Sequence, residues 1–88
     1  MADKKLPTGN VVPSELLIRS TKDLGELVRQ ARKVQHLKQV DIAGLANTGN
    51  RFIVDLEAGK PTIQLQKAIE VLSLLGLDLV VRRRGARS

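Results

Sequence analysis

The chain has 88 residues, of which 42% are hydrophobic, and 15 lysines and arginines against 9 aspartates and glutamates give a formal net charge of +6. This length allows one small domain, and because only 1% of the residues are aromatic, its core must be aliphatic. The absence of cysteine excludes disulfides and thiolate metal sites. No apolar run approaches the roughly 18 residues of a membrane span, and the start lacks a signal-peptide core. We therefore expect a cytoplasmic protein without membrane association, and the positive charge suits a polyanionic partner.

The beginning of the chain is patterned differently from the rest of it. Residues 1–19 contain Pro7 and Pro13 without a clear hydrophobic period, so an extended or mobile arm is predicted there. Ser20 is a favourable N-cap, and a first helix is predicted over residues 21–35. Apolar residues recur at helical spacing along that segment, at Leu24, Leu27, Val28 and Ala31.

The middle of the chain predicts two short helices joined by a tight turn, the first over 39–46 and the second over 50–58. Asn47 suits the left-handed backbone that a sharp turn needs, and Gly59 is a suitable end for the second helix. Helix, turn and helix at this spacing is the arrangement that places its second helix in the DNA major groove. The sequence therefore predicts a DNA-binding domain over residues 20–77.

A fourth helix is predicted after Thr62, which can cap its start, and Gly76 suits its C-terminal end. Its spacing of apolar residues places one face of the helix against the core. The residues expected on that face are Leu65, Ala68, Ile69, Leu72 and Leu75.

The segment 78–83 is rich in β-branched residues and too short for another helix, so it is predicted as a single β-strand. A lone strand leaves its backbone groups unpaired, and the simplest remedy is antiparallel pairing with the same strand of a second subunit. We therefore expect a homodimer, with a basic tail over 84–88 after the strand. The side chains expected at the dimer contact are Leu77, Leu79, Val80 and Val81.

The predicted motif carries a set of residues in a defined register: Leu37, Gln39, Ile42, Ala43, Ile53, Leu56, Glu57 and Gly59. In this register the chain resembles the lambda-repressor and Cro-like family, also called Xre-type regulators. The resemblance implies a mostly α fold of four helices, with a C-terminal β-strand that pairs across a dimer. A strand directly after the fourth helix is similar to the HipB-type antitoxin branch, which implies a HipA-type kinase toxin as a partner. The turn, Asn47-Thr48-Gly49, departs from the family pattern of Gly, an aliphatic residue and Ser.

The second helix of the motif starts with the main candidates for DNA contact. Arg51 can pair with guanine and Asn50 with adenine, unless they contact only phosphate. The resemblance implies that Gln39 contacts phosphate and braces the recognition helix; the alternative is an exposed polar residue. Phe52 is expected at the groove or at the boundary with the core. If it lay inside the core, it would be the only aromatic residue there. The predicted set is Lys38, Gln39, Gly49, Asn50, Arg51, Phe52, Val54, Asp55 and Lys60.

The charged residues around the motif have more than one interpretation. Asp55 would repel phosphate, so it is either a cytosine reader or a charge on the helix surface. Lys38 and Lys60 are candidate phosphate contacts, although exposed lysines are commonly only solvated. The resemblance also implies an ion pair between Arg32 and Glu57. Its expected role is to orient the helices, because desolvation opposes the attraction within such a pair.

The sequence offers no set of residues for catalysis or metal binding, because it lacks cysteine and has His36 as its single histidine. We therefore expect no enzyme activity, no cofactor and no metal. The predicted function is a dimeric repressor that binds an inverted repeat in double-stranded operator DNA, is nucleoid-associated when bound, and neutralises a HipA-type kinase toxin. The alternatives are a stand-alone Xre-type regulator without a toxin, and a protein-interaction module whose motif no longer binds DNA.

Overall fold

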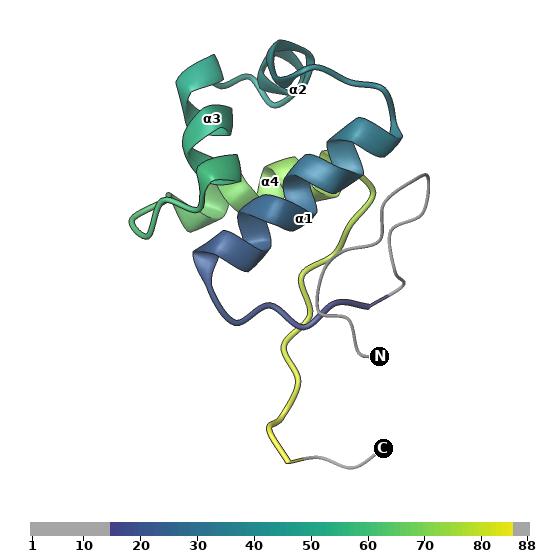
Figure 1. Ribbon diagram of the computed structural model, residues 1–88, viewed down its shortest axis with the longest axis vertical. Helices are drawn as coiled ribbons and strands as arrows, with labels where there is room; N and C mark the ends of the chain where they lie inside the picture. Colours follow the sequence, from purple (N-terminus) through teal and green to yellow (C-terminus); the bar gives the residue numbers. More distant parts are fainter. Residues whose placement is uncertain (1–14, 86–88) are drawn as a thin grey trace.

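The computed structural model describes residues 15–85, which form four helices (Figure 1). They are α1 (Thr21–Val34), α2 (Gln39–Leu45), α3 (Asn50–Ala58) and α4 (Leu65–Leu74). The first three agree with the predicted ranges to within one residue. Most of the predicted arm (1–14) and the end of the basic tail (86–88) lie outside the described residues. Within 15–85, no helix has the length and apolar character that would let it cross a membrane.

Helix α1 begins at a side-chain cap and packs along α3. Ser20 Oγ accepts a hydrogen bond from the backbone N–H of Asp23 at 3.2 Å, and Asp23 Oδ2 accepts one from the Arg19 N–H at 2.9 Å. Where the two helices cross, a Cβ built on Gly25 would lie 2.5 Å from the carbonyl oxygen of Leu56. Such an approach is open only to glycine, so Gly25 sets how closely α1 and α3 pack.

The start of α1 is also tied to the end of α3. Thr21 Oγ1 donates a hydrogen bond to the carbonyl oxygen of Gly59 at 2.8 Å. Gly59 ends α3 with a left-handed φ of 81°, and a Cβ built there would lie 2.7 Å from Cα of Lys22. Gly59 therefore serves both as the predicted helix end and as a point of close contact between the two helices.

The core between the helices is aliphatic, as the composition requires. The one aromatic residue, Phe52, is half-buried and packs at the edge of this core. Full burial of a valine, leucine or isoleucine side chain contributes about 1.5–3 kcal/mol. Packing in the core, rather than intrinsic helix propensity, therefore holds these short helices together. The largest fully buried side chains are Ile42, Ile53, Leu56, Val28 and Val71.

Helix α4 differs from the prediction at its start and on its inner face. It begins at Leu65 after Gln64, so Thr62 does not cap it. Leu65 is 57% exposed because it lies on the first turn, beyond the edge of the core, and Ile69 is only half-buried. The inner face instead follows the helical spacing i, i+3, i+4 and i+7. The buried residues of this face are Ala68, Val71, Leu72 and Leu75.

The predicted strand at 78–83 is not formed within the described single chain. Leu77 packs against the core, but from residue 78 to residue 83 the backbone has no regular structure and no backbone hydrogen bond to another described segment. A strand requires a ladder partner, and residues 15–85 of one chain provide none. Pairing with a second subunit therefore stays a prediction.

Candidate nucleic-acid interface

The turn between α2 and α3 is tight and is stabilised by its own backbone. Asn47 takes a left-handed φ of 55°, and the Thr48 N–H donates to the carbonyl oxygen of Ala43 at 2.9 Å. Gly49 has an extended backbone at φ −77° and precedes α3, with no heavy atom within 4 Å of a Cβ built on it. The departures from the family pattern thus leave the turn intact, because Asn47 supplies the left-handed residue.

Helix α3 exposes its first residues and buries its apolar face. Asn50 is exposed, and 84% of the Arg51 side chain is accessible. One turn further into the helix, Ile53 and Leu56 are buried in the core. Phe52 lies at the boundary between these two faces. The polar start of α3 is therefore held on a rigid apolar base.

Asp55 links two cations on the surface of α3. Its Oδ1 lies 3.3 Å from Arg51 Nε, and its Oδ2 lies 3.5 Å from Lys60 Nζ. The Asp55 side chain is only 20% exposed, whereas both cations are largely exposed, so the carboxylate is the fixed member of the group. Asp55 thereby places Arg51 and Lys60 at one part of the surface, next to the half-buried Val54.

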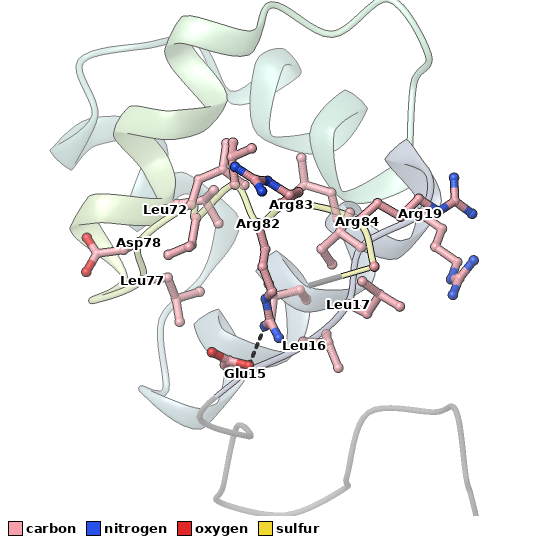
Figure 2. Close-up of a pocket in the computed structure, with 17 residues that line it drawn as sticks. Glu15, Leu16, Leu17, Arg19, Leu72, Leu77, Asp78, Arg82, Arg83 and Arg84 are labelled. Atoms are coloured by element: carbon pink, nitrogen blue, oxygen red, sulfur yellow. Dashed lines mark hydrogen bonds and ion pairs between the residues drawn. The ribbon is translucent and has the colours of Figure 1, made fainter. Parts of the chain in front are cut away.

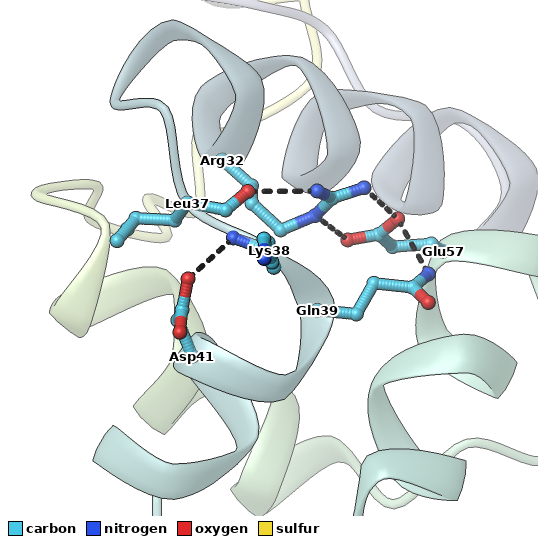
Figure 3. A network of polar contacts seen from close by, with 6 residues as sticks. All are labelled: Arg32, Leu37, Lys38, Gln39, Asp41 and Glu57. Carbon is cyan, nitrogen blue, oxygen red and sulfur yellow. Dashed lines mark hydrogen bonds and ion pairs between the residues drawn. The ribbon is translucent and has the colours of Figure 1, made fainter.

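Glu57 joins α1, α2 and α3 through a polar network (Figure 3). Its Oε2 lies 2.6 Å from Arg32 Nε, and its Oε1 accepts hydrogen bonds from Arg32 Nη2 at 2.9 Å and from Gln39 Nε2 at 3.1 Å. Arg32 Nη1 donates to the carbonyl oxygen of Leu37 at 2.9 Å. The hydrogen bonds to Glu57 raise the pKa of Arg32 above its ordinary value, against the opposing effect of burial. The guanidinium therefore stays charged and holds the start of α2 against the end of α3.

The residues of α2 have structural roles as well as candidate binding roles. Gln39 is half-buried and uses its amide on Glu57, which accounts for the bracing role but leaves phosphate contact a prediction. The Lys38 N–H donates to Asp41 Oδ2 at 2.7 Å at the start of the helix, while the Lys38 side chain is exposed.

The two predicted groups of site residues lie in different parts of the fold (Figure 1). All predicted DNA-contact residues lie on α2, α3 or the chain directly beside them. The predicted dimer residues lie on the segment after α4, on the side of the molecule away from α2. The two groups therefore lie on separate parts of the molecule.

Sequence reasoning missed three features that support this arrangement. Gly25 carries a recognisable signal, because an isolated glycine within a helical pattern often marks close packing. The bond from Thr21 to Gly59 and the ion pair between Glu15 and Arg82 carry none, because their partners are far apart in the chain.

Comparison with known proteins supports the fold and the motif. No model of a protein family matches the chain. It is 50% identical over 70 residues to the uncharacterized HTH-type transcriptional regulator y4mF of Sinorhizobium fredii (strain NBRC 101917 / NGR234), a match that covers 80% of this chain and 92% of the relative. The chain belongs to the family of helix-turn-helix transcriptional regulators.

Solved structures agree with this assignment at the level of the fold. The HipB–O4 20mer complex superposes with a TM-score of 0.73 at 17% identity, over 80% of this chain and 99% of that one. A complex of a HipB point variant with an O2 20mer gives the same TM-score of 0.73 at 18% identity, over 81% of this chain and 99% of that one. The predicted fold class, a four-helix domain of the lambda-repressor type resembling HipB, is therefore confirmed.

Proposed function

We propose that this regulator is a homodimeric repressor that reads operator DNA with α3. The observation that supports this proposal is the exposed pair Asn50 and Arg51 at the start of a helix whose far end is fixed by Glu57. Their side chains suit bidentate contacts with adenine and guanine in the major groove. Because the helix is fixed before it binds, DNA binding costs less conformational entropy.

The direct test selects binding sites from random DNA with the full chain at moderate salt and compares affinities for an enriched and a scrambled sequence. Specific binders of this kind prefer their sites by about 10³–10⁷-fold. We expect a preference in that range and an enriched sequence that is an inverted repeat. Equal affinity for the enriched and the scrambled sequence would contradict sequence-specific recognition, and no binding to either sequence would leave only the interaction-module alternative.

The dimer part of the proposal concerns the segment after α4. Leu79, Val80 and Val81 are all exposed in the single chain, which is unusual for three consecutive aliphatic residues and typical of an interface. Antiparallel pairing of residues 78–82 with their copies would satisfy the unpaired backbone and place these side chains beside those of the second copy.

Replacing Val80 with proline tests this pairing. We expect Val80→Pro to abolish or strongly weaken the dimer in light scattering, because proline removes a backbone donor and restricts the strand. The helices should be unaffected, because Val80 is 74% exposed. An unchanged dimer would mean that the interface lies elsewhere.

The finer proposal is that the protein is the antitoxin of a HipA-type kinase toxin. It is supported by the resemblance of the helix-four-plus-strand ending to the HipB-type branch and by the superposition on HipB. The surfaces left for a toxin are the outer faces of α1 and α4, so toxin and DNA could be held together.

Genomic neighbourhood and co-purification separate the antitoxin from a stand-alone regulator. We expect a kinase-like reading frame beside this gene, whose product co-purifies with the protein and adds to the operator complex. A kinase that competes with DNA would contradict joint repression. The absence of any such neighbour would support the stand-alone regulator.

A further inference from the structure

The two described ends of the chain line one open groove (Figure 2). Residues 15–19 and 77–85 line it, together with the buried side chains of Leu24, Leu27 and Leu72. We call this feature the terminal groove. The predicted dimer segment forms part of the lining of the terminal groove.

Both extended segments of the terminal groove have unpaired backbone and exposed aliphatic side chains. Among residues 15–85, neither 15–18 nor 78–83 makes a backbone-to-backbone hydrogen bond with another segment. Leu17 is 70% exposed and Val81 is 92% exposed. Exposed aliphatic residues beside backbone with unpaired hydrogen-bonding groups favour association with another extended segment.

An ion pair joins the two segments of one chain. Arg82 Nη2 lies 2.7 Å from Glu15 Oε1, although the residues are separated by 67 positions in the sequence (Figure 2). Both side chains are mostly exposed, so this pair alone stabilises the arrangement only slightly. It does show that residues 15–18 can lie beside the dimer segment of the same chain.

We propose that residues 15–18 form part of the homodimer interface, so that a second copy of this chain docks in the terminal groove against both segments. This inference rests on the proposed dimer and adds residues 15–18 to its interface. A stable interface takes about 20–30 residues a side, and a strand of about five residues falls far short of that number. Residues 15–18 lie beside the predicted dimer segment in the terminal groove, so they enlarge the surface that a second copy can contact.

The chemistry of the groove favours a second copy over a nucleic acid or a purely acidic peptide. Its lining includes the acidic Glu15 and Asp78 as well as four arginines, so it presents both signs of charge beside aliphatic side chains. A two-fold interface uses the same surface twice and therefore needs a surface that is complementary to itself. The four arginines are Arg19, Arg82, Arg83 and Arg84.

The first test replaces Leu17 with aspartate in the full chain and measures the dimer dissociation constant by sedimentation equilibrium. Burial of a leucine in each subunit is lost, so we expect the constant to rise by about tenfold or more. Leu65→Asp is the matched control, because Leu65 is 57% exposed and lies outside the terminal groove. It should leave the constant unchanged, and both variants should retain the helical content of the parent.

The second test exchanges the charges of the ion pair. Glu15→Arg and Arg82→Glu should each raise the dimer dissociation constant by about two- to fivefold, the range of exposed ion pairs. The double variant should return it to the parent value. Weakening by each single change without recovery in the double variant would contradict the paired arrangement of the two segments.

The outcomes separate this inference from the dimer proposal itself. A dimeric parent with an equally tight Leu17→Asp dimer would overturn the role of residues 15–18 but leave the dimer in place. A monomeric parent at all concentrations would overturn both. If Leu17→Asp left the dimer intact but lost a co-purifying kinase, the terminal groove would belong to that partner and the inference would be wrong.

Discussion

The helix-turn-helix region and the two chain ends differ in how many of their backbone groups and side chains find partners within one chain. From residue 37 to residue 60, Ile42, Ile53 and Leu56 are buried and Glu57 has three donors from Arg32 and Gln39, although Val40 and Leu45 are exposed. The backbone of the helices and of the turn is hydrogen-bonded within the chain. At the ends, residues 15–18 and 78–83 expose aliphatic side chains and unpaired backbone. The backbone of the first region is satisfied within one chain, whereas the backbone of the two end segments is not paired with any other segment of residues 15–85.

This difference indicates two kinds of binding. A helix such as α3, which is already fixed by its contacts within the chain, can bind DNA with little loss of conformational entropy. Its specificity then depends on which side chains it presents to the bases. A segment with unpaired backbone is stabilised by association with a second chain, so the stabilisation depends on protein concentration. Substitutions in the two regions should therefore be separable in their effects on folding, DNA affinity and dimerisation.

The largest effect is expected for Glu57→Ala, which breaks the network that completes the first region. It leaves Arg32 buried without its partner, and we expect a loss of about 3–5 kcal/mol in the free energy of unfolding, measured by urea denaturation. Glu70→Ala is the control, because Glu70 is exposed and, among residues 15–85, its side chain bonds only to Gln66 of its own helix. This change should alter stability by about 0.5 kcal/mol or less. A small loss for Glu57→Ala would show that the network does not anchor α3.

The next effect concerns the close packing of α1 on α3. Gly25→Ala should cost about 1–3 kcal/mol, because its Cβ would meet backbone atoms of Leu56 and Glu57, which cannot move aside cheaply. Gly44→Ala in α2 is the matched control, because a Cβ there has open space. It should instead gain about 0.5–1 kcal/mol from helix propensity. Thermal unfolding of the two variants would show opposite shifts; equal shifts would contradict the crossing geometry.

A third change should affect DNA binding without affecting the fold. Arg51→Ala should weaken binding to the enriched sequence by about 1–3 kcal/mol and relax the preference at one base position. Unfolding should be unchanged, because Arg51 is exposed. Arg29→Ala, an exposed arginine of α1, serves as the control in fluorescence anisotropy. A uniform loss across all DNA sequences would mean that Arg51 contacts phosphate only.

The smallest effect is expected for Asp55→Asn, which removes the carboxylate between Arg51 and Lys60. Affinity for random DNA should rise slightly, because one negative charge near phosphate is lost. Discrimination should fall by about 1 kcal/mol or less, because Arg51 loses its exposed ion pair. Glu26→Gln on α1 removes the same charge elsewhere and should change neither quantity. A larger fall in affinity that is confined to the enriched sequence would show that Asp55 itself contacts a base.

Local sequence signals were enough for the first region and insufficient for the second. Ser20, Asn47 and Gly59 mark helix ends through short-range chemistry, so the first three helices could be placed within one residue. The start of α4 could not be placed, because Thr62 has the right side chain but the helix begins only after Gln64.

Contacts between distant residues explain the remaining differences. The exposure of Leu65 depends on where the core ends, and the pairing of Glu15 with Arg82 depends on the path of both chain ends. No periodic pattern encodes either feature. The position of the candidate DNA residues was predictable because all lie on one motif, but the use of the Asp55 carboxylate on Arg51 and Lys60 was not.

The central claim is that a dimer of this chain presents two copies of α3 to one stretch of DNA. The most direct test measures the mass of the complex on the enriched inverted repeat and on an isolated half-site, by native mass spectrometry at a fixed protein concentration. We expect two chains on the full repeat and much weaker binding to the half-site, because half-site spacing mirrors the two-fold symmetry of the protein. One chain per repeat, with equal affinity for the half-site, would contradict the account.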